Sequence, residues 1–220
     1  ALVNARTAAD VQKIAEYDYN FFVHYGFYND GFTETENNPN GGYVTRNVLN
    51  TMFQMVGTTS APVQLYSGVL GRSTPGTARL FGNGDLELLF KAAHDSNTTE
   101  KDIFVGYIET GTNPAADATL VTEHIAFYLQ DNTLYASNAN GTTQTRTDIS
   151  SGITLTNWNT YYIIFDSGTN IKFYVNDVLK ATHTTNLPST TQPISKVWFD
   201  NPGTGTREFV LGNDYIIASP

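Results

Sequence analysis

The sequence contains no cysteine, few charged residues and no long apolar run, and each absence excludes a class of function. Without cysteine the chain forms no disulfide, has no thiolate nucleophile and binds no metal through sulfur. Only 15% of the 220 residues are charged, and a net charge of −9 leaves too few cations for a nucleic-acid or anionic-membrane partner. Because no run of about 18 apolar residues occurs, we expect no membrane insertion.

Threonine, asparagine and aromatic residues are abundant instead. The chain has 31 Thr, which suit pleated surfaces, and 21 Asn, which suit turns. Thirteen Tyr, thirteen Phe and two Trp supply the bulk of a sandwich core. Helical spacing of apolar residues is confined to the first 25 positions. The composition therefore predicts an all-β protein of many short strands joined by many turns.

The strand pattern is clearest in residues 158–186. The segment 161–165 is apolar on both faces, which is typical of a central strand covered on each side. A polar loop with Gly168 separates it from a second strand at 171–176. Asn176 and Asp177 both tolerate a left-handed backbone, so the chain can turn back into a third strand at 178–184. We predict a β-meander here.

Similar segments recur along the chain from Val63, with Gly, Asn, Asp and Pro at the joints. Spacing of roughly 8–12 residues is typical of a β-sandwich or jelly roll. The expected strands after Val63 are 63–70, 77–82, 85–93, 102–110, 121–130, 133–138, 143–149, 153–166, 171–176, 178–184, 194–200 and 206–218.

The first part of the chain is less regular. Residues 1–25 predict an N-terminal arm or helix capped by Thr7, which either packs on the sandwich or docks on a partner. The pattern at 17–28 also fits a strand, 29–42 predicts a loop, and 43–56 favours a bulged strand over a short helix. Since no linker or compositional break follows, we expect one domain over residues 26–220.

Several segments together resemble a known superfamily. The segments are His-Ile-Ala-Phe-Tyr-Leu at 124–129, Leu-Tyr-Ala-Ser-Asn at 134–138, a Trp-opened strand at 158–165, Ile-Lys-Phe-Tyr-Val-Asn-Asp at 171–177, Ala-Thr-His-Thr-Thr-Asn-Leu-Pro at 181–188 and Gly-Asn-Asp-Tyr-Ile-Ile at 212–217. Their order resembles the second half of a concanavalin A-like lectin/glucanase domain, although Asp177 replaces the usual Gly of the family hairpin. The resemblance implies a two-sheet antiparallel jelly roll. Members of that superfamily include glucanases, polysaccharide lyases, lectins and non-catalytic surface modules, some of them on viral particles.

The catalytic patterns of those enzymes are incomplete in this chain. Retaining glucanases of this fold carry three acids on one strand, and here Asp85 and Glu87 share a strand face without the third. Arg146 could mimic the arginine strand of the lyases, but the Gln-x-His strand of those enzymes does not occur. We therefore predict a protein that is not an enzyme. The alternative is a polysaccharide hydrolase or lyase with a degenerate motif.

Sugar binding requires aromatic faces that stack on C–H surfaces and polar groups that bond hydroxyls. Neighbouring strands offer such residues, and His124 is expected to face away from the core or into the concave sheet face. The alternative, that each aromatic belongs to the core, stays open. The predicted ligand-binding residues are Tyr107, Glu109, His124, Tyr128 and Trp198, with Tyr135 and Asn138 nearby.

A structural Ca²⁺ is the one cofactor that the resemblance implies. Asp214 in the last strand and the oxygen-rich loop 29–31 would supply its ligands, unless Asp214 only caps a turn or faces solvent. We expect partners to be glycans or other virion or surface proteins, and we expect a homo-oligomer. Because the chain shows no signal peptide, the predicted location is a virion surface, as a phage capsid decoration or fibre, or the outside of a cell.

Overall fold

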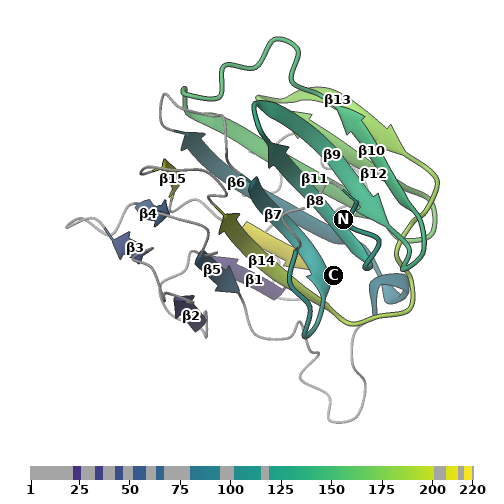
Figure 1. Cartoon of the computed structure of the whole chain (residues 1–220). Helices are drawn as coiled ribbons and strands as arrows, with labels where there is room; N and C mark the ends of the chain where they lie inside the picture. The colour runs from purple at the N-terminus through teal and green to yellow at the C-terminus, as the bar shows by residue number, and fades with distance from the viewer. Residues whose placement is uncertain are drawn as a thin grey trace.

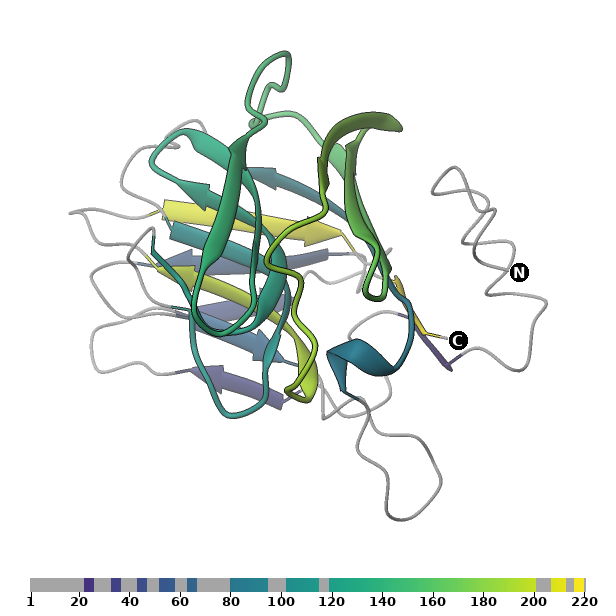
Figure 2. The same ribbon diagram turned by 90° about the vertical axis from the view of Figure 1, so that its right-hand side faces the viewer.

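The computed structural model describes residues 22–25, 33–36, 43–46, 52–57, 63–66, 80–94, 102–114, 119–200, 207–212 and 216–219. These residues form two antiparallel sheets, which Figures 1 and 2 show from two directions. The nine-stranded sheet contains β1 (Phe22–Tyr25), β3 (Tyr43–Arg46), β4 (Met52–Gly57), β6 (Leu86–His94), β11 (Asn159–Asp166), β12 (Asn170–Val175), β13 (Val178–His183), β15 (Arg207–Gly212) and β16 (Ile216–Ser219). The seven-stranded sheet contains β2 (Thr33–Glu36), β5 (Val63–Tyr66), β7 (Asp102–Glu109), β8 (His124–Gln130), β9 (Thr133–Ala139), β10 (Gln144–Asp148) and β14 (Pro193–Asp200).

The strand order makes this a jelly-roll sandwich, as the sequence predicts. The seven-stranded sheet runs β10-β9-β8-β7-β14-β5-β2, and the longest path through the other sheet runs β13-β12-β11-β6-β15-β4-β3. Strand β16 pairs with β6 and with β1 beside that path. The predicted meander is confirmed, because β11, β12 and β13 are consecutive antiparallel neighbours.

The core between the sheets is rich in aromatic side chains. Phe90 and Tyr161 of the nine-stranded sheet stack at 4.9 Å between ring centroids. Phe127 of the other sheet meets both rings edge-on, and it meets Phe173 in the same way at 5.5 Å. Such contacts each add about 0.5–1.5 kcal/mol to the gain from burial. Nine of the Phe and Tyr side chains that the structure describes belong to this core.

Tight turns fix the register of the hairpins. Asn176 and Asp177 have φ of 51° and 62°, and Asp131 and Asn132 both have φ of 47°. Two successive positive φ values make the type I′ turn that matches the twist of a two-residue hairpin. The predicted left-handed turn at Asn176-Asp177 is therefore confirmed.

Gly106 is required for the close approach of β7 and β8. A Cβ atom at this position would lie 2.1 Å from the backbone oxygen of Ile125. No side chain fits in that space, so the middle of the seven-stranded sheet depends on this glycine.

Several local predictions were wrong. The expected strand 43–56 contains two antiparallel neighbours, β3 and β4, and the expected strand 206–218 contains β15 and part of β16. Strand β2 lies inside the expected loop 29–42, where it pairs with β5. The expected strand 77–82 contains the start of a 3₁₀ turn at Phe81–Asn83, and residues 153–158 precede β11 rather than extending it. In each case the local pattern did not reveal the tertiary partner that decides pairing. Of the arm predicted for residues 1–25, the structure describes only residues 22–25, and these form β1 of the nine-stranded sheet.

Candidate functional site

The outer face of the seven-stranded sheet, the face turned away from the other sheet, carries a row of aromatic side chains. Tyr135, Tyr128, Phe104 and Trp198 stand opposite one another across β9, β8, β7 and β14. Cross-strand neighbours lie close enough for their rings to meet, and those of Phe104 and Tyr128 do so edge-on at 6.3 Å. This row provides the aromatic surface that sugar binding needs, and the exposure of each ring decides its use.

The middle of the outer face is covered. Phe104, Tyr128 and Trp198 are at most 2% exposed, and Leu120 from the segment after β7 packs into the same cluster. The same segment is tied to the sheet by Lys196, whose Nζ donates hydrogen bonds of 2.6 Å to Thr112 O and to Asn113 Oδ1. Burial lowers the pKa of Lys196 to about 8. These rings therefore have almost no surface on which a sugar can stack.

The edge of the same face, on β8, β9 and β10, remains partly open. The Arg146 guanidinium lies 3.7 Å from the centroid of the Tyr135 ring and 5.7 Å from that of Tyr128. Its terminal nitrogen also donates to Gln130 Oε1 at 3.2 Å. Gln130, Tyr135 and Arg146 are all half-buried, and we call these three residues the edge site. A cation, a ring and an amide meet here, and each side chain keeps part of its surface accessible.

A chain of hydrogen bonds lies beside the edge site. His124 Nδ1 is 2.7 Å from Thr122 O, which only accepts, so this nitrogen carries the proton. Nε2 then accepts from the Ser137 hydroxyl at 2.8 Å, and Ser137 Oγ accepts from Gln144 Nε2 at 3.0 Å. Burial lowers the pKa of His124 to about 4, so the ring is neutral. Because His124 and Ser137 have no exposed surface, this chain holds the sheet together and meets no substrate in this conformation.

Glu123 fastens the loop that precedes β14. Its carboxylate accepts hydrogen bonds from the backbone N–H groups of Ser189, Thr190 and Thr191 and from both threonine hydroxyls. Burial acts to raise the pKa of Glu123, but these bonds outweigh it and the pKa is lowered. A charged acceptor with so many donors fixes the loop in place.

A second buried acid lies on the outer face of the nine-stranded sheet. Tyr162 donates its hydroxyl proton to Glu87, whose side chain is buried. Burial raises the pKa of Glu87 to about 7, and nearby Asp85 raises it further while the Tyr162 bond opposes both. Among the residues that the structure describes, no three His, Cys, Asp or Glu side chains gather closely enough to bind a metal. Asp214 and the loop 29–31, predicted to bind Ca²⁺, lie outside those residues.

The structure separates the residues predicted to bind ligand. Tyr107 faces the core between the sheets and donates its hydroxyl to Glu87 O at 2.6 Å. Glu109 is half-buried at the end of β7, where its backbone oxygen accepts from the Thr112 hydroxyl. His124, Tyr128 and Trp198 share the outer face but are covered. The expectation of one open sugar-binding face across these strands therefore needs correction, because β7 and β8 are buried on both sides and strand alternation alone does not show which face is open.

The two further candidates on β9, Asn138 and Tyr135, lie on opposite faces of the sheet. Asn138 points toward the other sheet, where its amide donates to Thr185 O and Asn186 O and its oxygen meets His183 Nδ1 at 2.6 Å. Tyr135, by contrast, lies under Arg146 at the edge site. One sequence signal could have indicated that site, because Arg146 is the only Lys or Arg between Lys101 and Lys172. No sequence signal marks Gln130.

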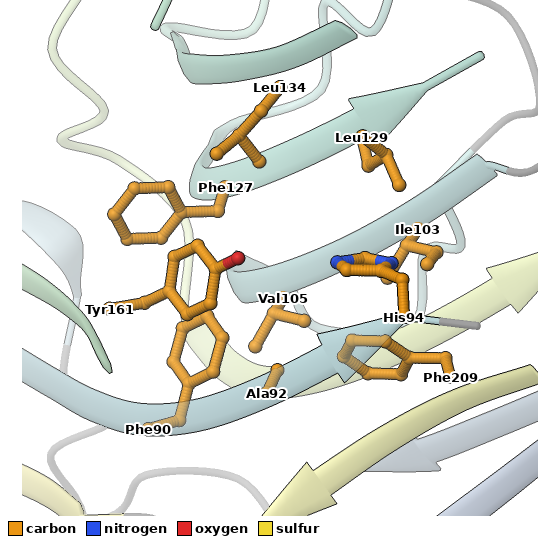
Figure 3. A pocket seen from close by; sticks show the side chains of 10 residues that line it. All are labelled: Phe90, Ala92, His94, Ile103, Val105, Phe127, Leu129, Leu134, Tyr161 and Phe209. Atoms are coloured by element: carbon orange, nitrogen blue, oxygen red, sulfur yellow. The ribbon is translucent and has the colours of Figure 1, made fainter. Parts of the chain in front are cut away.

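An interior cavity lies between the sheets (Figure 3). Its volume of about 20 Å³ has room for little more than one water molecule and excludes a sugar ring. The hydroxyl of Tyr161 reaches it, buried and with no hydrogen-bond partner in the described part of the chain. The lining residues are Phe90, Ala92, His94, Ile103, Val105, Phe127, Leu129, Leu134, Tyr161 and Phe209.

Similar structures are numerous, whereas no family model and no curated protein matches the sequence. An alginate lyase from Corynebacterium sp. aligns with a TM-score of 0.57 over 91% of this chain and 94% of its own, at 13% identity. Arcelin-5, a lectin-like defence protein from Phaseolus vulgaris, aligns with a TM-score of 0.57 over 91% and 97%, at 11% identity. The ligand-binding domain of botulinum neurotoxin serotype D, solved with N-acetylneuraminic acid, aligns with a TM-score of 0.52 over 84% of this chain and 42% of that one, at 10% identity.

These likenesses establish the fold. The chain has the concanavalin A-like jelly-roll fold that its sequence resembles, and its structural neighbours include an alginate lyase and a toxin domain solved with N-acetylneuraminic acid. At such identities the fold alone is shared, so function depends on the site. No described helix has the length and apolar character that a membrane span requires.

Proposed function

We propose that this protein is a non-catalytic, surface-exposed module that binds glycan at the edge site. The observation that carries this proposal is the Arg146 guanidinium held 3.7 Å above the Tyr135 ring, next to Gln130. The three side chains keep accessible surface, whereas the remaining aromatics of the same row are covered.

The chemistry of the edge site suits a saccharide. The Tyr135 ring offers an apolar face for sugar C–H groups, and the Gln130 amide offers a donor and an acceptor for hydroxyls. Arg146 would form a two-pronged pair with a carboxylate on an acidic sugar. The alginate lyase and the toxin domain solved with N-acetylneuraminic acid support a carboxylate-bearing ligand, since alginate and N-acetylneuraminic acid both carry that group.

A binding assay tests this proposal. We expect the purified chain to bind alginate oligosaccharides or sialylated oligosaccharides in calorimetry, and to bind neutral β-glucan oligosaccharides more weakly. Arg146→Ala should weaken binding about tenfold or more, which corresponds to about 1.4 kcal/mol. Lys180→Ala is the matched control, because it removes a cation from β13 that donates to Ser151 O, away from the edge site. Equal loss in both variants, or no binding to any saccharide on a glycan array, would reject the proposal.

A polysaccharide lyase or hydrolase is the second candidate. Support comes from Glu87, whose raised pKa of about 7 suits a general acid, and from the alginate lyase among the structural neighbours. Release of unsaturated or reducing ends from alginates and β-glucans would show the activity. Activity abolished by Glu87→Gln in a variant that stays folded would place this candidate first.

We also propose that the module acts on an assembly, as a virion or extracellular surface protein. An N-terminal arm at residues 1–25 would attach it, and a homo-oligomer would multiply weak glycan contacts. Deleting residues 1–20 should release the protein from its assembly and leave the sandwich folded. Unchanged incorporation of that variant would refute the arm, and a monomer in light scattering would refute the oligomer.

A further inference from the structure

We propose that Asn140 is a self-modifying site, at which the turn after β9 promotes conversion of the side-chain amide into a carboxylate. Residues 140–143 form the exposed turn between β9 and β10, and Asn140 N donates to Thr143 O across it. Gly141 has a φ of +90°, which suits the first central position of a type II′ hairpin turn. Asn140 is therefore followed by a glycine in a well-defined and solvent-exposed turn.

The reaction involves only the side chain of Asn140 and the next backbone amide. The Gly141 nitrogen attacks Cγ of Asn140, so an N–Cγ bond forms, the Cγ–Nδ2 bond breaks, and ammonia leaves with the amide proton. The resulting five-membered imide then adds one water molecule and opens to aspartate or isoaspartate. Glycine favours the attack because it carries no Cβ to crowd the nitrogen. Beyond the two neighbours of Gly141, an added Cβ there would meet nothing closer than Glu123 Cγ at 3.8 Å.

The turn supplies hydrogen-bond donors at the atom where negative charge develops. Asn140 Oδ1 accepts from Thr142 N at 3.1 Å, from the Thr142 hydroxyl at 2.9 Å and from Thr143 N at 2.9 Å. This oxygen becomes the oxyanion when the nitrogen adds to Cγ. Donors already in place at a developing oxyanion lower the barrier to its formation, as in acyl-transfer enzymes.

Conversion would change the contacts of the hairpin. Asn140 Nδ2 donates to Asn186 Oδ1 at 3.4 Å, and this donor is lost when the amide becomes a carboxylate. Two oxygens would then face each other, so the turn would lose one of its ties to the chain after β13. Asn186 would keep its own bonds to Asn138 and Thr145. The sandwich therefore stays folded while one exposed turn gains a negative charge.

Peptide mapping by mass spectrometry tests the proposal on the full chain. Incubation at mildly alkaline pH should raise the mass of the peptide that holds Asn140 by about 1 Da, with isoaspartate among the products. Thr142→Val removes one donor and should slow the conversion about tenfold. Thr142→Ser keeps the hydroxyl and should restore the rate. The other Asn-Gly pairs, Asn40-Gly41 and Asn83-Gly84, serve as internal references, because their conversion rates should not change between variants.

The outcomes separate the proposal from simple exposure of an Asn-Gly pair. A slower rate at Asn140 alone in the Thr142→Val variant supports a reaction promoted by the turn. An unchanged rate, or an Asn140 that keeps its amide while the other two pairs convert, overturns it. If Thr142→Val disturbs the hairpin, the Ser variant still decides, because a wild-type rate is then required.

Discussion

On the outer face of the seven-stranded sheet, aromatic side chains are buried in the middle and partly exposed at the edge. Trp198 and Tyr128 stand in one cross-strand row with Tyr135, yet of these three rings only Tyr135 is partly exposed. In the middle, the segment after β7 lies over the row and is held by the buried amine of Lys196. At the edge, Arg146 covers one face of the Tyr135 ring, and both side chains are only half-buried. An aromatic residue on this face therefore contributes to stability where another segment buries it, and it is available for recognition where it is partly exposed.

The largest expected effect contrasts the two regions directly. Trp198→Ala should lower the free energy of unfolding by about 3–5 kcal/mol, because it removes a buried ring and leaves a cavity. Tyr135→Ala should lower it by about 1 kcal/mol or less, since that ring is partly exposed. Urea unfolding monitored by circular dichroism measures both. Similar losses in the two variants would mean that the middle and the edge are equally packed.

The second largest expected effect is a loss of stability at acidic pH, which arises from buried histidines. Burial holds the pKa values of His124 and His183 at about 4, below their unfolded value of about 6.5. Their stabilising contribution is complete above pH 6.5 and is lost as pH falls toward 4. Glu87 acts in the opposite sense, because its pKa of about 7 lies above its unfolded value, so it stabilises at low pH.

Acidification removes the contribution of two histidines and adds that of one acid. We therefore expect the free energy of unfolding to fall by about 2 kcal/mol between pH 7 and pH 4.5. Urea titrations at several pH values measure the slope. Glu87→Gln should make the loss on acidification steeper, because it removes the opposing group, whereas His183→Asn should make it shallower. A wild-type protein whose stability rises as pH falls over this range would contradict the assignment of neutral, buried histidines.

The sequence was sufficient to predict the fold, and the reasons are local. Both faces of 161–165 are apolar, and Asn176-Asp177 carries its turn signal in two adjacent residues. The site was harder to predict, because Tyr107 on β7 and Tyr128 on β8 look alike in strands that are buried on both sides. The outer face of the sheet is buried by segments outside its strands, such as residues 112–113, and no local sequence pattern encodes that contact. Arg146 was visible as an isolated cation, but its place on the Tyr135 ring depends on the register of β9 and β10.

A smaller change in stability is expected in the interior of the sandwich, where the side chains are fully buried. Tyr161 carries a buried hydroxyl that has no hydrogen-bond partner among the described residues, next to the cavity in Figure 3. Tyr161→Phe keeps the ring that stacks on Phe90 and removes the unsatisfied group, so stability should rise by up to about 1 kcal/mol. Thermal unfolding of the two proteins measures the change. A clear loss of stability would indicate that a bound water satisfies this hydroxyl.

The most direct measurement for the central claim is an NMR titration of the labelled chain with alginate oligosaccharides and sialylated oligosaccharides. The account predicts that shifts concentrate at Gln130, Tyr135 and Arg146, that Phe104 and Trp198 stay unchanged, and that Arg146→Ala removes the response. Shifts centred on β7 and β14 instead, or on the Glu87 side of the other sheet, would contradict binding at the edge site.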